Sequence, residues 1–173
     1  MRSNARETHP GKAPLPPLSE TLEFMRLLWA IDHGLQRRSK RMAATLGVTG
    51  PQRLVIRILG RSPGISAGHL AQALHLHPST LTGILRRLEQ KGLMTRERDS
   101  RDLRRAVLHL SAAGRRLDVE TAGTVESAMK AALARVPARQ VKAAREVLCA
   151  LADEIQPRPG SSRAGSRRGP AAA

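Results

Sequence analysis

Residues 70–96, LAQALHLHPSTLTGILRRLEQKGLMTR, decide the fold class of this chain. A short segment with helical apolar spacing ends in the tight connection 75–77, and Pro78 is well placed as the first residue of a second helix. That helix extends towards Gly92, which suits the position just after a helix end. Its apolar face is formed by Leu81, Ile84, Leu85 and Leu88. Two short helices joined by a tight turn, the second with a polar and basic outer face, predict a helix-turn-helix.

The segment that follows predicts a β-wing. Residues 93–97 and 105–110 alternate or run apolar in the manner of strands. Between them, RDSRDLR at 98–104 is too charged to be buried. A strand, a charged loop and a second strand placed directly after a helix-turn-helix indicate a winged helix.

Upstream, capping and spacing signals predict three helices. Ser19 is the expected N-cap of a long helix that ends at Gly47. A short extended link is expected at 64–65, after which Ser66 caps the third helix. The second helix is expected to begin after Pro51, and its apolar residues are Leu54, Val55, Ile58 and Leu59.

Downstream, the pattern predicts two long helices. Ser111 caps one that is expected to run without a break to Val136, and Pro137 begins the last helix. The apolar stripes of the outer helices exceed what one small lobe can bury, which predicts an obligate homodimer. These stripes lie at 22–46, 114–136 and 141–155.

The expected fold class is therefore mainly α, a winged helix-turn-helix with long N- and C-terminal helices forming a dimerisation stem. A chain of 173 residues suits one domain with tails. Residues 1–18 are expected to be a flexible N-terminal arm and 19–156 the winged-helix and dimerisation domain. The segment 157–173, PRPGSSRAGSRRGPAAA, has arginines, no acid and no large apolar residue, and is expected to be a disordered basic tail.

The charge balance favours a polyanionic partner. There are 30 Lys and Arg against 14 Asp and Glu, a formal net charge of +16, and a small domain with that excess repels itself until a polyanion neutralises it. Nucleic acid is the first expectation, a membrane surface the second and acidic proteins the third. No apolar run approaches the ~20 residues of a membrane span, and the N-terminus lacks the apolar core of a secretory signal. A soluble cytoplasmic protein with no membrane partner is expected.

Catalytic and metal sites are not expected. A single cysteine excludes an internal disulfide framework and a Cys-rich zinc site, and Cys149, beside Leu148, is expected to be a small buried apolar residue. His75 and His77 would make half a metal site, without neighbouring carboxylates or cysteine. Because no nucleophile elbow, phosphate-cradling glycine loop or paired carboxylates occur, we expect no enzymatic activity, no cofactor and no metal.

The stretch from about Leu70 to Gly114 resembles the multiple-antibiotic-resistance-regulator (MarR) family of bacterial winged-helix repressors. Besides the opening stretch, the likeness is carried by the D-x-R of Asp102-Leu103-Arg104 and by VLHLSAAG at 107–114. The flanking helices extend it to about 19–156, and both tails lie outside it. The resemblance implies a homodimer that holds two winged lobes over an inverted repeat in double-stranded DNA. The fourth helix would enter the major groove and the wing the neighbouring minor groove.

The chemistry of the fourth helix agrees with that role. Free N–H groups at a helix N-terminus attract phosphate, so Ser79 and Thr80 are expected on the DNA backbone. One turn along, Thr82, Gly83 and Arg86 can face base edges, since glycine permits close approach and arginine can pair with guanine. The complete expected DNA-binding set is His77, Ser79, Thr80, Thr82, Gly83, Arg86, Arg87, Arg101 and Arg104.

Two wing residues receive separate roles. Arg104 at a wing tip fits the narrow, electronegative minor groove. Asp102 is too acidic to approach phosphate, and the resemblance implies that it braces the wing through an ion pair.

Two functions remain open at this point. The leading one is a ligand-responsive transcriptional repressor, released when a small-molecule effector enters a cleft between stem and lobe. The alternative is an architectural DNA-binding protein with low sequence specificity. The basic cluster at 37–41 is either a solvated face or a further DNA contact. The expected effector cleft is lined by Met25, Trp29, Asp32, His33 and Arg37.

Overall fold

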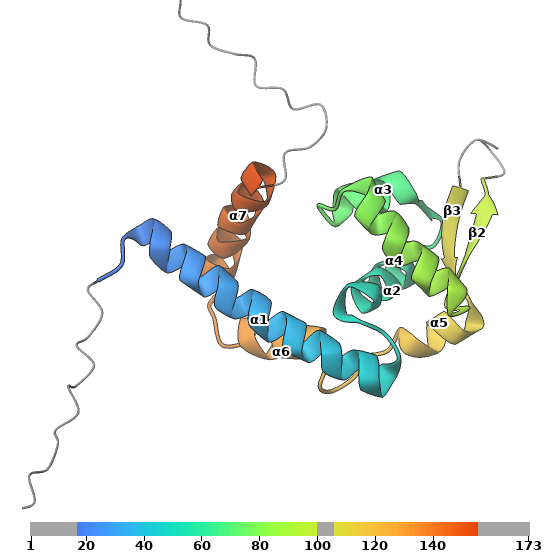
Figure 1. Cartoon of the computed structure of the whole chain (residues 1–173), viewed down its shortest axis with the longest axis horizontal. Helices are drawn as coiled ribbons and strands as arrows, with labels where there is room; N and C mark the ends of the chain where they lie inside the picture. The colour runs from blue at the N-terminus through green and yellow to red at the C-terminus, as the bar shows by residue number, and fades with distance from the viewer. Residues whose placement is uncertain (1–16, 100–105, 156–173) are drawn as a thin grey trace, which may run out of the picture.

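The computed structural model describes residues 17–99 and 106–155, and over these the fold is mainly helical with one small sheet (Figure 1). Residues 1–16 of the expected arm, the basic tail and the wing residues Arg101, Asp102 and Arg104 lie outside the described residues. The elements are α1 (Glu20–Leu46), α2 (Gly50–Arg61), β1 (Ile65–Ser66), α3 (Ala67–Ala73), α4 (Pro78–Gln90), β2 (Met94–Arg98), β3 (Ala106–Leu110), α5 (Ala112–Leu117), α6 (Val125–Leu133) and α7 (Ala138–Ile155).

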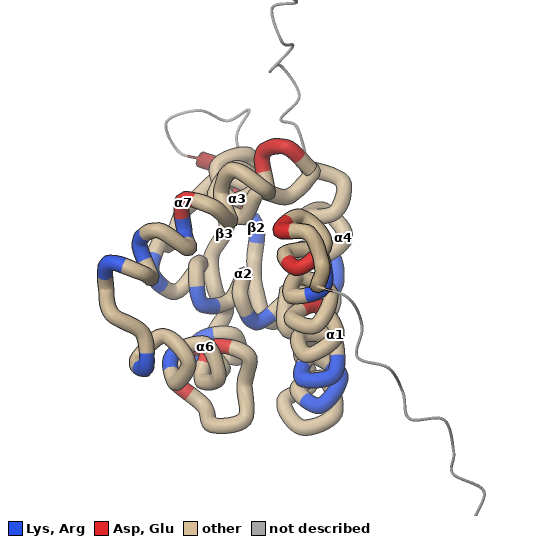
Figure 2. Tube along the Cα trace, turned by 90° about the vertical axis from the view of Figure 1, so that its left-hand side faces the viewer, with Lys and Arg blue, Asp and Glu red and all other residues tan. Residues whose placement is uncertain are grey.

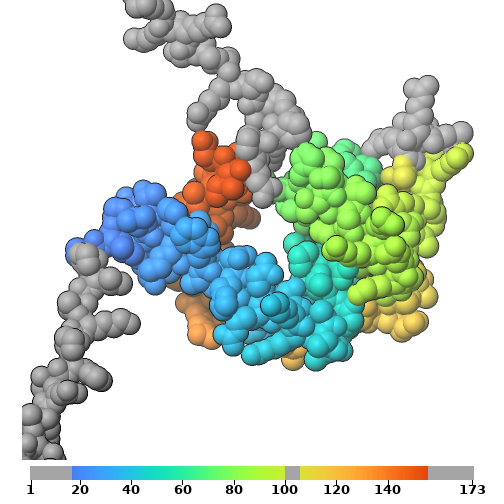
Figure 3. Space-filling view, viewed as in Figure 1, coloured from blue at the N-terminus to red at the C-terminus, as the bar shows by residue number. Residues whose placement is uncertain are grey.

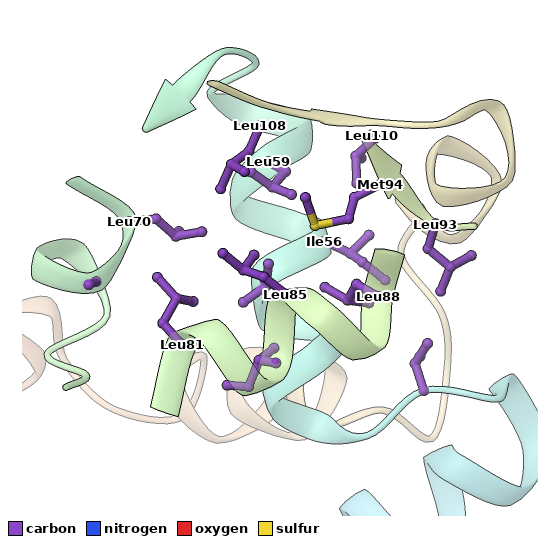
Figure 4. Packing of buried hydrophobic residues seen from close by; sticks show 14 residues of the cluster. Ile56, Leu59, Leu70, Leu81, Leu85, Leu88, Leu93, Met94, Leu108 and Leu110 are labelled. Carbon is purple, nitrogen blue, oxygen red and sulfur yellow. The ribbon is translucent and has the colours of Figure 1, made fainter. Parts of the chain in front are cut away.

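One hydrophobic core holds the lobe formed by α2 to α5 and the sheet (Figure 4). The apolar face predicted for α4 is buried in it, with Leu81, Leu85 and Leu88 at most 1% exposed. The expected apolar face of α2 is wrong at one position, because Leu54 is 51% exposed and Ile56 is buried instead. The predicted winged helix-turn-helix is confirmed.

The sheet contains one strand more than the sequence pattern predicts. Its order is β1-β3-β2, with both pairings antiparallel. Ile65 of the expected link at 64–65 in fact begins an edge strand, in which it pairs with Leu108. A strand of two residues is too short for the alternation that identifies strands in a sequence.

The long helix expected from Ser111 to Val136 is wrong. Ser111 does cap a helix, accepting a hydrogen bond from the Gly114 amide at 3.0 Å, but α5 ends at Leu117 and α6 begins only at Val125. Thr124 caps α6 by accepting from the Ser127 amide at 3.2 Å, and Gly123 takes a left-handed φ of 76°. The chain therefore turns between lobe and stem where the apolar stripe suggested continuity.

The stem consists of α1, α6 and α7, which lie to one side of the lobe (Figures 1 and 3). Met42 is the one buried residue of α1, and α6 and α7 contain none. Cys149 on α7 is exposed in the single chain, so its predicted burial is wrong for the protomer. The reason is that α7 contacts too little of its own chain to cover that helix. Across the described residues, no helix is long and apolar enough to cross a membrane.

Candidate nucleic-acid interface

The outer face of α4 is the candidate interface. Because Leu81, Ile84, Leu85 and Leu88 anchor its inner face in the core, the helical period turns the intervening side chains away from the lobe. Gly83 on that face is partly buried, and an added Cβ there would meet nothing within 4 Å. The exposed side chains of α4 and its N-cap include His77, Ser79, Thr80, Thr82, Arg86 and Arg87, with Glu89 and Gln90 exposed at the end of the helix.

The turn before α4 depends on two histidines. His75 takes a left-handed φ of 50°, a conformation that histidine tolerates better than most residues. His77 is the N-cap of α4, and its Nδ1 accepts a hydrogen bond from the Ser79 amide at 3.3 Å. An accepting Nδ1 places the proton of the neutral ring on Nε2. His77 therefore orients the start of α4 and keeps one N–H donor.

A local contact positions one polar side chain of α4, and its two arginines make no ion pair among the described residues. The Thr82 hydroxyl donates to the Pro78 carbonyl at 2.8 Å, which leaves the hydroxyl oxygen able to accept a hydrogen bond. Arg86 and Arg87 make no ion pair with any described residue. Two exposed cations without an ion pair, in the second half of α4, suit an anionic partner.

Cationic positions extend beyond α4 onto the stem (Figure 2). Within the basic cluster at 37–41, Arg38 donates to the Thr124 carbonyl at 3.4 Å. That contact joins α1 to the start of α6, so one member of the cluster has a structural partner inside the chain.

The five residues expected to line an effector cleft all lie exposed on α1. A cavity of about 680 Å³ lies elsewhere, between α2 and α6, and none of the five lines it. Its walls combine apolar and charged side chains, including Leu54, Arg57, Arg61, Glu126, Lys130 and Ala131. The structure therefore gathers the predicted cleft residues on one helix without enclosing them.

Arg53 is a residue that sequence reasoning missed. Its side chain is 2% exposed and lies between lobe and stem, where its guanidinium bonds to the Glu126 carboxylate and to backbone carbonyls. No local signal identifies it, because a cation within an apolar helix is usually exposed. Its partners follow it by more than sixty positions.

The comparisons with known proteins agree on one class. A sequence model of the MarR family matches residues 48–106. The HTH-type transcriptional repressor of Mycobacterium tuberculosis (strain H37Rv) is 30% identical over 122 residues, covering 70% of this chain and 88% of the relative. The organic hydroperoxide resistance transcriptional regulator of Bacillus subtilis (strain 168) is 31% identical over 102 residues, covering 57% and 69%.

Solved structures show the same architecture. The crystal structure of a MarR family transcription regulator has a TM-score of 0.56 at 25% identity, covering 78% of this chain and 87% of the other. The Staphylococcus aureus MepR–DNA complex has a TM-score of 0.63 at 20% identity, covering 77% and 98%. The Streptomyces coelicolor regulator PcaV, solved with its natural ligand, has a TM-score of 0.64 at 21% identity, covering 82% and 99%. The last two support the fold alone.

Proposed function

The chain belongs to the MarR family of DNA-binding transcription regulators, and we propose that it is a homodimeric repressor of sequence-specific type. It binds an inverted repeat in double-stranded DNA and is released by a small-molecule effector. The observation that carries the proposal is the outer face of α4, which is polar, exposed and free of internal ion pairs at both of its arginines.

In this proposal α4 enters the major groove. Ser79 and Thr80, at the helix N-terminus, contact phosphate. Thr82 offers a methyl group and an acceptor to a base edge, and Gly83 permits the close approach. Arg86 pairs with guanine through its two parallel donors.

Further contacts extend the footprint. His77 and Arg87 flank the base-reading face of α4 and meet the DNA backbone. From the wing, Arg101 contacts phosphate and Arg104 enters the minor groove, while Asp102 braces the wing through an ion pair. These roles follow from the family pattern, since all three wing residues lie outside the described part of the chain.

Dimerisation is supported by the stem. Large apolar side chains there remain open to solvent in the single chain, and a second copy is the partner that symmetry favours. Two α4 helices would then meet half-sites about one helical turn apart. The exposed apolar residues of the stem include Leu22, Phe24, Leu27, Trp29, Leu133, Val136, Val147 and Leu148.

Repression and effector release are each supported by a different known protein. The Mycobacterium tuberculosis relative is named a repressor, and PcaV was solved with its natural ligand. We place the effector against Met25, Trp29, Asp32, His33 and Arg37, which combine an apolar surface with both charge signs. A partner chain would have to complete that cleft, because the five residues are exposed on one helix of the protomer.

A second candidate, an architectural DNA-binding protein, is favoured by the net charge of +16. The arginines of 157–173 would follow phosphates without reading bases. Deleting this tail would then weaken specific and random duplexes alike and flatten the slope of log affinity against log salt by roughly 3.6 at most. Equal slopes for the full and truncated chains would show that the tail takes no part.

Selection of bound duplexes from a random pool at physiological salt tests the proposal. A palindromic sequence that is protected in a footprint supports the repressor, whereas equal binding to random duplex supports the architectural role. On the selected site, Arg86→Ala should lose about 1–3 kcal/mol of binding free energy. Arg139→Ala, an exposed arginine of α7, removes the same charge from the stem and controls for a general loss of attraction. Equal losses in the two variants would contradict base reading by Arg86.

A further inference from the structure

The buried guanidinium of Arg53 joins the winged lobe to the stem. Its Nε and Nη2 donate to the two carboxylate oxygens of Glu126 at 3.0 and 2.8 Å. Nη1 donates to the Leu117 carbonyl at 3.0 Å and Nη2 to the Val119 carbonyl at 2.6 Å. A single side chain of α2 therefore holds the end of α5, the turn after it and the first turn of α6.

These contacts account for the break between α5 and α6. The last carbonyls of a helix have no partner within that helix, and Arg53 supplies donors to the carbonyls of Leu117 and Val119. Arg57, one turn further along α2, adds an ion pair to Asp118 at 2.5 Å and another to Glu126 at 3.5 Å. The direction in which the chain leaves the lobe is thus fixed by side chains of α2.

A second set of contacts, made by α1, holds the place where α2 meets the turn before α6, which we call the corner. The Gly50 amide donates to the Ser39 hydroxyl at 2.8 Å, and Met42 Sδ accepts from the Val125 amide at 3.4 Å. Thr124, fully buried, completes the turn by donating to the Thr121 carbonyl at 2.7 Å. α1, α2 and α6 therefore meet at one corner, which holds the only buried charge of the described residues, that of Arg53.

We propose that Arg53 is a positioning residue for DNA recognition, which sets the angle between lobe and stem and thereby the separation of the two α4 helices in the dimer. This inference rests on the proposed function, because it needs a dimer on an inverted repeat. Arg53 itself touches no DNA in this arrangement, since its side chain is buried between α2 and the start of α6. Its effect appears in the half-site spacing that the protein accepts.

The expected consequence is geometric. Adding one base pair between half-sites moves one of them by about 3.4 Å and turns it by roughly 35° about the DNA axis. If the corner is rigid, the dimer binds the altered spacing more weakly. If the corner is loosened, the two α4 helices can adjust to that spacing. The unaltered protein should prefer the selected spacing over spacings one base pair longer or shorter by about tenfold or more, a ratio that measures the stiffness of the corner.

The test compares four variants of the full chain on duplexes of the three spacings. Arg53→Lys keeps the charge and loses the planar fork, and Glu126→Gln keeps the shape of the carboxylate and one acceptor oxygen. Lys130→Met and Glu120→Gln are the matched controls, because they break an exposed ion pair between the same turn and α6, with side chains 72% and 66% exposed. Sedimentation and thermal melting accompany each titration, to confirm a folded dimer.

Support for the proposal is a spacing preference that falls to about threefold or less in Arg53→Lys and in Glu126→Gln and stays intact in both controls. The proposal would be overturned if both variants form folded dimers that keep the full spacing preference. Arg53 would then contribute to stability alone. If Arg53→Lys does not fold, the milder Glu126→Gln decides by the same ratio. An unaltered protein with no spacing preference would overturn the proposed function and this inference together.

Discussion

The lobe and the stem differ in how much of their apolar surface is buried within the single chain. In the lobe, fourteen residues from several elements close into one core within a single chain. In the stem, α6 and α7 contain no buried residue, and apolar side chains as large as Trp29, 66% exposed, face solvent. The lobe therefore buries its apolar residues within one chain, whereas the stem leaves large apolar side chains exposed in the protomer.

The strongest test of that contrast is a cavity in the lobe. Leu85→Ala should lower the free energy of unfolding by about 2–5 kcal/mol, because Leu85 is 1% exposed and its neighbours cannot collapse fully into the space. Denaturant unfolding measures the loss. Leu54→Ala, at a 51% exposed leucine of α2, should cost far less, and equal losses would show that the core does not govern the stability of the lobe.

Alanine substitutions at two glycines, one buried and one on the outer face of α4, test how tightly the lobe is packed at each position. A Cβ on Gly114 would lie 2.0 Å from the Leu93 carbonyl oxygen, so Gly114→Ala should cost about 1–3 kcal/mol of stability through the shifts it forces. Gly83→Ala meets open space and should leave stability unchanged or raise it by up to about 1 kcal/mol.

The same pair separates folding from DNA binding. Melting temperatures measure the first, and titration of the selected duplex measures the second. Gly83→Ala should weaken DNA binding although it folds at least as well, because the added methyl group occupies the face that approaches the groove. Unchanged affinity would move the interface away from Gly83.

The stem is tested by a charge on its exposed apolar surface. Leu148 on α7 is 53% exposed in the single chain, so Leu148→Lys should spare the fold of the protomer. The dimer dissociation constant should rise about tenfold or more, which is roughly 1.4 kcal/mol. Sedimentation across a concentration series gives the constant, and circular dichroism confirms that the helices persist. A dimer as tight as the unaltered protein would place the contact surface elsewhere on the stem.

The smallest effect is expected at the exposed pair between the turn 118–124 and α6. Lys130 Nζ donates to Glu120 at 2.7 Å, and this hydrogen bond lowers the pKa of the Glu120 carboxyl. A lowered pKa in the folded state means that the pair stabilises the fold above the ordinary glutamate pKa. The contribution disappears as the pH falls through the lowered value.

Melting curves of the unaltered protein and Glu120→Gln measure that pair. They should differ slightly at neutral pH and coincide in strong acid. A difference that persists in acid would mean that the substitution acts through something other than the charge of Glu120.

Local patterns predicted the lobe well and the turn into the stem poorly. The face of α4 followed from the spacing of its leucines, because burial repeats within one helix. The break before α6 could not be predicted in this way, since the apolar stripe from Gly114 to Val136 is continuous and the partners that interrupt it sit on α2. Arg53 acts on residues distant in sequence, and no periodicity carries that information.

The candidate site was also predicted better in the lobe than in the stem. The residues of α4 lie where the pattern places them, and their roles on DNA stay predictions. The side chains predicted to line a cleft on α1 are all exposed in the protomer, and so is Cys149. A pattern reports that a face is apolar, and it does not report which chain covers it.

The pairing of β1 with β3 has a consequence for synthesis of the chain. Ile65 is made well before Leu108, the residue it pairs with, and closing so long a loop is a slow, entropically costly step. While the ribosome is still translating α4 and β2, the helices can form locally, yet the edge of β1 has no neighbour. The sheet of the lobe can be completed only when β3 leaves the exit tunnel. A pause in translation before that point would leave the domain partly folded and accessible to chaperones and proteases.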